Sequence, residues 1–218
     1  MIRLHHVPQA RSFRVLWLLE ELGLPYELVL HSFFDKSLRS DPFASLSPAG
    51  RVPAIEIDGR SMIESGAIVQ YLCERKGRLL GVPEERPEWL EWIHFAETVA
   101  VHVANLTQQH IVLREDWMRS PTLMRLEAKR LERTLKAVET RMAGDYLLGS
   151  GFSAADIAVS YGAMIGRRFV PFDALPGIEN WLLRLADRPA LQRALEKDGP
   201  AQIYLREFYP APEEEKHG

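Results

Sequence analysis

The stretch that decides the fold runs from residue 50 to residue 67 and reads GRVPAIEIDGRSMIESGA. Two short apolar runs flank the pair Asp58-Gly59. An Asp-Gly pair in this setting predicts a β-hairpin, because the tight turn needs positive φ. A helix is expected to begin directly after the second strand, at Glu64 or Ser65. The hairpin excludes a purely parallel sheet.

The residues before this stretch predict a β-α-β order. Residues 2–6 (IRLHH) and 26–30 (YELVL) can form short strands. Between them, apolar residues at i, i+3, i+4 and i+7 define one face of a helix over about 12–22. A glycine and a proline then end this helix. Residues 31–50 are expected to be an irregular connection.

The chain after residue 77 shows no strand pattern. Helices are expected over 89–109, 122–142, 154–166, 177–186 and 189–197, with a frayed tail over 210–218. The predicted organisation is a small α/β domain over 1–77, a polar, proline-containing linker over 78–87 and an all-helical domain over 88–218.

Composition excludes several classes of function. The net charge of −3 gives no basic surface for nucleic acid. No run approaches the ~20 apolar residues of a membrane helix, and the N-terminus lacks the apolar run of a secretory signal. The single cysteine, Cys73, cannot form an internal disulfide, which fits a reducing compartment. We therefore expect a cytoplasmic globular protein without a nucleic-acid or membrane partner.

The clearest local motif of the helical half is a capping box. Ser153 can cap a helix start while Asp156, three residues on, reaches back to the Ser153 amide. Phe152 and Ile157 stand at the positions of a hydrophobic staple. We assign this motif to folding, with a stability contribution of about 1 kcal/mol from the cap.

Arg51-Val52-Pro53 allows two interpretations. A proline is tolerated at the first residue of a strand or at a sheet edge. Alternatively, a cis-proline would turn the Val52 N–H and C=O outward, where they could pair with an extended peptide ligand.

Glu64-Ser65 also allows two interpretations. Ser65 can simply cap the helix that follows. A helix start also offers unpaired N–H groups and a positive dipole end to a carboxylate, and Glu64 could accept hydrogen bonds from an ammonium group. Together they could hold an amino-acid headgroup.

Four segments in this order and spacing resemble the glutathione transferase family in its bacterial, cytosolic form: RVLWLLEELGLPYE from residue 14, GRVPAIEIDG from 50, ESGAIVQYL from 64 and YLLGSGFSAADIAVS from 146. The resemblance covers nearly the whole chain. It implies a thioredoxin-like N-terminal domain, a helical-bundle C-terminal domain and a homodimer. It also implies that glutathione serves as co-substrate, without a metal, and that its thiol is activated for attack on small, mostly hydrophobic electrophiles, as in detoxification.

The resemblance also assigns the glutathione-binding residues. Pro53 becomes the cis-proline, Val52 pairs with the cysteinyl part of glutathione, and Arg51 belongs to the same segment. Glu64 and Ser65 hold the γ-glutamyl end.

The chain departs from the family where the thiol is activated. Many relatives carry a serine, tyrosine or cysteine just before the first helix, but Ala10 stands at the serine position here. Backbone amides at the helix start, Arg11 or the Ser12 hydroxyl could stabilise a thiolate instead. We select Ser12 as the catalytic residue; capping the helix is its structural alternative. Without a cysteine nearby, no protein thiol is expected to exchange disulfides, and Cys73 is expected to be packed.

The acceptor site is less clear from the sequence. A polar stripe follows the first helix of the second domain, through Glu91, His94, Thr98, His102, Asn105 and Gln109, and it could face solvent, substrate or a second subunit. No HExxH motif points to a metal. Candidates for the pocket wall are Trp117, Tyr161, Met164 and Arg168, of which core packing would equally explain the first three.

Two further functions fit the same sequence. Ala10 is the feature that would suit a non-catalytic module that kept the fold for binding or regulation. A glutathione-dependent peroxidase or isomerase would share the site and differ in its second substrate, because fold alone does not settle function.

Overall fold

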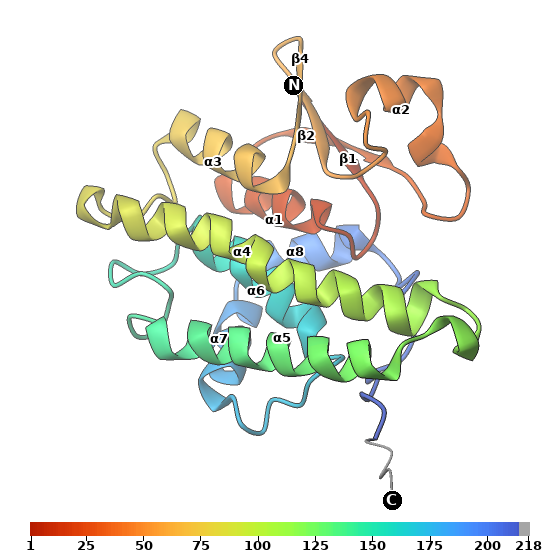
Figure 1. The fold of residues 1–218 in the computed structure, drawn as a ribbon. Coiled ribbons are helices and arrows are strands. Elements are labelled where there is room, and N and C mark those ends of the chain that lie inside the picture. Colours follow the sequence, from red (N-terminus) through yellow and green to blue (C-terminus); the bar gives the residue numbers. More distant parts are fainter. Residues whose placement is uncertain (214–218) are drawn as a thin grey trace, which may run out of the picture.

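The protein combines a small sheet and its helices with a larger set of helices, and the computed structural model describes residues 1–213 (Figure 1). The first part contains β1 (Ile2–His6), α1 (Ser12–Leu22), β2 (Tyr26–Leu30), the 3-10 helix η1 (Ser37–Arg39), α2 (Asp41–Leu46), β3 (Ala54–Ile57), β4 (Arg60–Ile63) and α3 (Ser65–Lys76). Of the tail predicted to fray, residues 210–213 form neither helix nor strand and 214–218 lie outside the described residues.

The sheet has the strand order β2-β1-β3-β4. β1 and β2 are parallel, with Leu4 opposite Leu28. β3 runs antiparallel to both β1 and β4. The hairpin turn has φ of 51° at Asp58 and 75° at Gly59, which confirms the turn predicted from this pair. The sheet is therefore mixed, as the sequence indicated.

The connection over 31–50 is more regular than predicted, because it contains η1 and the six-residue helix α2. Phe43 of α2 is only 2 % exposed, and its ring centroid lies 4.6 Å from that of His31. One buried aromatic residue thus anchors a helix that is too short for hydrophobic periodicity to reveal.

The second part is helical. Its elements are the 3-10 helix η2 (Pro83–Glu85), α4 (Arg86–Thr107), the π-helix η3 (Gln108–Val112), the 3-10 helix η4 (Asp116–Met118), α5 (Pro121–Arg141), α6 (Ala154–Gly166), α7 (Pro176–Ala186) and α8 (Pro189–Asp198). α4 begins within the segment predicted as a linker. In Figure 1, α4 and α5 run beside each other below the sheet. No helix among residues 1–213 is both long and apolar enough to cross a membrane.

The capping box at the start of α6 is confirmed. The Ser153 N–H donates to Asp156 Oδ2 at 2.9 Å, and the Ala155 N–H donates to Ser153 Oγ at 3.2 Å. Asp156 Oδ1 also accepts from the Leu147 N–H and from Trp181 Nε1, both at 3.0 Å. The box therefore fixes the start of α6 to the loop before it and to α7.

α1 lies where the two parts meet (Figure 1). It contacts β1 and α3 in the first part, and α6 and α8 in the second. Residues 15–19 of α1 are all completely buried, as expected of a helix enclosed on every side. α6 in turn packs closely on α4, because a Cβ at Gly162 would lie 2.7 Å from Val99 Cγ1. The start of α1 is therefore positioned by both parts of the chain.

Candidate functional site

The turn before β3 contains a cis peptide bond between Val52 and Pro53. Pro53 is buried, Val52 is half-buried and Arg51 is exposed. The Arg51 N–H donates to Ser47 Oγ at 3.2 Å, and the Ser47 hydroxyl donates to the Arg51 carbonyl oxygen at 2.8 Å. Within residues 1–213, no hydrogen bond occupies the Val52 N–H or C=O. These two groups remain available to an added strand.

Ser47 supports the turn before β3, and the sequence analysis did not single it out. Its side chain is almost completely buried and holds both backbone groups of Arg51. A serine followed by proline, three residues before the next segment of interest, looks like an ordinary turn. Only the fold shows that this hydroxyl fixes the turn that carries Val52.

The start of α3 presents the predicted pair, but Ser65 does not cap the helix. Glu64 precedes the helix in a left-handed conformation (φ 71°) and is exposed. Ser65 is the first helical residue, and no side chain caps the helix. The first amides of a helix lack intrahelical partners, so the start of α3 keeps N–H donors and a positive dipole end.

The hydroxyl of Ser65 faces a buried arginine. Ser65 is 4 % exposed, and its Oγ accepts a hydrogen bond from Arg14 Nη1 at 3.1 Å. Arg14 is 1 % exposed and also pairs with the Glu97 carboxylate. Its Nη2 donates to the Ala96 carbonyl oxygen at 3.0 Å, and its guanidinium lies 5.2 Å from the Tyr161 ring centroid. Arg14 thereby joins α1, α3, α4 and α6 behind the site.

Arg14 and Glu97 were not singled out from the sequence. Helical spacing places Arg14 on the same side as Glu21, seven residues on, and outside the predicted apolar face, so the sequence pattern is typical of a solvated arginine. Arg11 Nη1 also binds Glu97, at 2.5 Å from Oε2. Glu97 is 41 % exposed while Arg14 is buried, so the Arg11–Glu97–Arg14 cluster reaches from the interior to the surface.

The start of α1 differs from the expectation for Ser12. Ser12 is completely buried. Its Oγ lies 2.8 Å from His6 Nδ1 and accepts the Val7 N–H at 3.3 Å. It does not cap α1, because the cap position is Arg11 and no side chain bonds there. As the group that activates a thiol, Ser12 stays a prediction, and its burial disfavours direct contact with a ligand.

Arg11, the residue before Ser12, is more accessible than Ser12. Arg11 has 35 % of its side chain exposed, and Ala10 is 8 % exposed. Within the described residues, the N–H groups of Arg11 and Ser12 form no backbone hydrogen bond. The start of α1 therefore offers backbone donors and a guanidinium rather than a side-chain hydroxyl.

The polar stripe on α4 turns mainly toward α5. Glu91 forms two hydrogen bonds with Arg141, at 2.7 and 2.9 Å. His102 Nδ1 lies 2.8 Å from Glu127 Oε2, which also accepts from Asn105 Nδ2 at 3.1 Å. Three residues of the stripe, Glu91, His102 and Asn105, thus pair with α5 inside the same chain. The sequence analysis had not considered this pairing.

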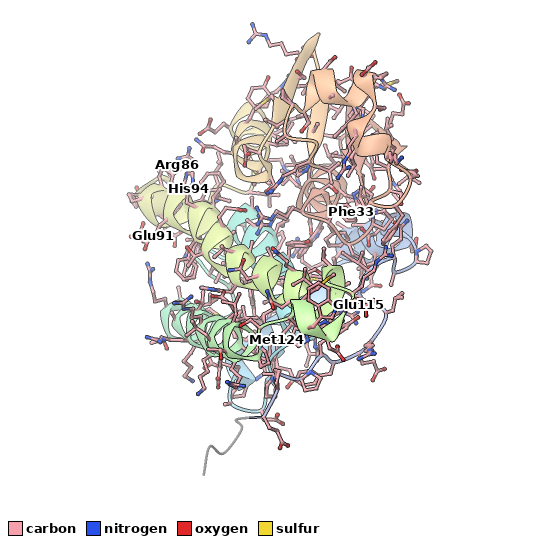
Figure 2. The ribbon with its side chains drawn as sticks, turned by 45° about the vertical axis from the view of Figure 1, so that its right-hand side comes forward. Phe33, Arg86, Glu91, His94, Glu115 and Met124 are labelled. Atoms are coloured by element: carbon pink, nitrogen blue, oxygen red, sulfur yellow. The ribbon has the colours of Figure 1, made fainter. Side chains whose placement is uncertain are left out.

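Figure 2 shows where the first residues of the stripe lie on the molecule. Figure 2 shows Glu91 and His94 beside Arg86 near the start of α4. Phe33, after β2, and Glu115, after α4, lie on the other side of that view. The early part of the stripe is therefore well separated from these two residues.

The remaining candidates separate into buried and exposed groups. Tyr161 is 6 % exposed and donates its hydroxyl to the Gln9 carbonyl oxygen at 2.9 Å, beside the start of α1. Trp117 is 80 % exposed. Cys73 is buried, and burial raises the pKa of its thiol to about 12. Among residues 1–213, no group of three His, Cys, Asp or Glu side chains could hold a metal ion.

The mixed sheet with its cis-proline, joined to an all-helical part, defines a two-part thioredoxin-like class of protein. A family model described as the N-terminal domain of glutathione S-transferase matches residues 4–84. Glutathione S-transferase 3 of Schizosaccharomyces pombe is 30 % identical over 214 residues, which cover 90 % of this chain and 88 % of that protein. The chain belongs to the glutathione S-transferase family.

Two further similarities bear on what members of this family do. The disulfide-bond oxidoreductase YfcG of Escherichia coli is 28 % identical over 207 residues, covering 90 % of this chain and 95 % of that protein. A glutathione transferase from Burkholderia graminis, solved with two glutathione molecules bound per subunit, superposes with a TM-score of 0.82 at 27 % identity. That match covers 89 % of this chain and 87 % of the other.

Proposed function

We propose that this protein is an enzyme that binds glutathione and activates its thiol for attack on small, mostly hydrophobic electrophiles. The observation that carries the proposal is the convergence of unpaired backbone donors at the Val52–Pro53 turn and at the starts of α1 and α3. Arg14 of α1 binds Ser65 at the start of α3 directly, so the two helix starts belong to one structural unit.

The start of α3 suits the γ-glutamyl end of glutathione. The carboxylate of the γ-glutamyl residue would accept hydrogen bonds from the Ser65 amide and hydroxyl at the positive end of the helix dipole. Its ammonium group would be balanced by the exposed carboxylate of Glu64. The γ-glutamyl headgroup would then pair with the hydrogen-bond donors of Ser65 and with the acceptor oxygens of Glu64.

The Val52 turn suits the cysteinyl residue. Val52 would exchange its N–H and C=O with the peptide backbone of glutathione, as an added strand does. The Ser47 contacts keep this turn fixed, and Arg51, exposed beside it, would face the peptide. The thiol would then be carried toward the start of α1.

The start of α1 would lower the thiol pKa. A free thiol has a pKa of about 8.5, and helix N-termini and nearby cations lower it. The amides of Arg11 and Ser12 and the Arg11 guanidinium supply both effects, and we favour them over the buried Ser12 hydroxyl. The thiol proton would leave to solvent, and the sulfur electron pair would form a C–S bond with the electrophilic carbon, which releases its leaving group or accepts the displaced pair.

A non-catalytic glutathione-binding module is the second candidate. Ala10 favours it, because this side chain cannot donate a hydrogen bond to a thiolate. Disulfide exchange through a protein thiol is disfavoured by the burial of Cys73, so an oxidoreductase function would depend on glutathione thiols. A homodimer and a cytoplasmic location belong to the proposal and are tested by light scattering and by fractionation.

The experiment is calorimetric titration of glutathione into the wild type and the double variant Glu64→Ala/Ser65→Ala, followed by turnover of chlorodinitrobenzene. The exposed pair Ser61→Ala/Glu84→Ala is the matched control. We expect the site variant to weaken binding by about a hundredfold, from two lost charge-assisted hydrogen bonds, and the control to bind normally. Binding without turnover would favour the module, and no binding by the wild type would refute the glutathione site.

A further inference from the structure

The turn just before α1 holds an unusual backbone conformation. Gln9 has φ of 61°, a left-handed value that residues with a side chain adopt at a cost. It is followed directly by Ala10 and Arg11, which begin the proposed thiol site. Such a conformation persists only where the surroundings determine it, so its contacts are informative.

Three polar groups of Gln9, which are its N–H, its carbonyl oxygen and its side-chain oxygen, are bonded to the second part of the chain. Its N–H donates to both oxygens of the Asp198 carboxylate, at 3.1 and 3.2 Å. Its carbonyl oxygen accepts from the Tyr161 hydroxyl at 2.9 Å. Its side-chain oxygen accepts from the Gln202 N–H at 3.1 Å. The turn is therefore held from α8, from α6 and from the segment after α8.

A second connection reaches Asp198 through His6. His6 is completely buried. Its Nδ1 lies 2.8 Å from Ser12 Oγ, and its Nε2 lies 3.1 Å from Asp198 Oδ1 without the alignment of a hydrogen bond. A serine, a histidine and an aspartate thus stand in a row, but the buried Ser12 cannot meet a substrate as a nucleophile. The row instead packs the residues on both sides of the Gln9 turn against α8.

We propose that Asp198 and Tyr161 are positioning residues for the thiol site. They hold the Gln9 turn, and through it they aim the first amides of α1 and the Arg11 side chain at the bound sulfur. The proposal rests on the proposed function for its catalytic consequence. Misplacing a reacting group by about 1 Å can cost about a hundredfold in rate, so loss of these anchors would affect chemistry more than binding.

The test compares two anchor variants with one matched control. Tyr161→Phe removes a single hydroxyl and keeps the ring that faces Arg14, while Asp198→Leu keeps about the same size and removes both oxygens that accept from the Gln9 N–H. Tyr204→Phe is the control, because Tyr204 is 5 % exposed and its hydroxyl bonds Thr107 Oγ1 at 2.9 Å and no group of Gln9. All three variants lose one buried polar interaction and should lose comparable thermal stability.

The expected result separates positioning from folding. Both anchor variants should lose about tenfold in kcat for chlorodinitrobenzene conjugation, keep the Kd for glutathione within about threefold, and bind glutathione with a thiol pKa closer to the free value of about 8.5. Tyr204→Phe should change none of these. If the wild type is active and both anchor variants keep its kcat and its thiol pKa, the positioning role is overturned and the proposed function stands.

Amide hydrogen exchange at Gln9 and Ala10, whose N–H groups donate to Asp198 and to the Val7 carbonyl oxygen, tests the same role without glutathione. The anchor variants should exchange at least about tenfold faster there than the wild type, since the bonds that hold the turn are lost. Unchanged exchange, or equal acceleration in Tyr204→Phe, would overturn the proposal. If the wild type bound no glutathione, the proposed function would fail, and this exchange result would decide the positioning role alone.

Discussion

The starts of α1 and α3 both place a serine at the first helical position and differ in where that side chain points. A non-glycine residue with positive φ precedes each helix, Glu64 directly before α3 and Gln9 three positions before the first residue of α1. Ser65 meets a guanidinium at the edge of the site, whereas Ser12 turns inward to His6. The same residue type at the first helical position thus meets a guanidinium in one helix and a histidine in the other, and the surrounding elements decide which.

The largest effect is expected from breaking the connection between the two helix starts. Arg14→Ala removes a buried guanidinium that bonds Ser65, Ala96 and Glu97. We expect the free energy of unfolding to fall by about 3 kcal/mol, as when one partner of a buried ion pair is removed. Urea denaturation measures it.

Arg11→Ala is the matched control for that variant, since Arg11 shares Glu97 but is partly exposed. It should cost no more than about 1 kcal/mol. Equal losses of stability in the two variants would show that α1 and α3 do not depend on the buried arginine.

The contacts of Glu20, near the C-terminal end of α1, should make the stability of the fold sensitive to acid. Burial alone would raise the pKa of the Glu20 carboxyl, but hydrogen bonds from Lys197, Tyr26 and Arg193 outweigh it and lower the pKa to about 2, from 4.5. A carboxyl group whose pKa is lower in the folded state than in the unfolded state stabilises the fold at pH values above its unfolded-state pKa. About 3 kcal/mol of stability should therefore be lost as the pH falls from about 4.5 to about 2.

Glu20→Gln should flatten this part of the curve of unfolding free energy against pH. Glu84→Gln, at an exposed position outside the cluster, serves as control. Parallel curves for the wild type and Glu20→Gln between pH 4.5 and pH 2 would contradict the assignment.

The two serines give the most direct test of the comparison, with smaller effects. Ser65→Ala should weaken glutathione binding by about tenfold, from one lost hydrogen bond to a charged group.

Ser12→Ala should leave the glutathione Kd within about twofold and cost about 1–2 kcal/mol of stability, because His6 Nδ1 loses its buried partner. Calorimetry and urea denaturation measure both variants. The reverse pattern would make Ser12 the ligand-facing serine.

The fold was largely predictable because its signals are local. The Asp58-Gly59 turn, the mixed sheet and the Ser153–Asp156 capping box follow from residue types at fixed spacing, and the structure confirms all three. The domain boundaries at 77 and 87 stay a prediction. α2 was missed because it is short and anchored by a single aromatic residue.

The site was only partly predictable because its contacts are long-range. Glu64 and Ser65 could be proposed from one stretch of sequence. Asp198 lies 189 positions from Gln9, and no spacing rule joins them. The inward direction of Ser12 depends on His6 and on the packing of α8, which a helix pattern does not contain.

The most direct test of the central claim is the ultraviolet absorption of the thiolate of bound glutathione, followed against pH in the wild type and in Arg11→Ala. The account predicts a wild-type thiol pKa well below the free value of about 8.5, and a partial return toward that value in Arg11→Ala. A wild-type complex with an unshifted thiol pKa would contradict it, because the start of α1 would then hold glutathione without activating it.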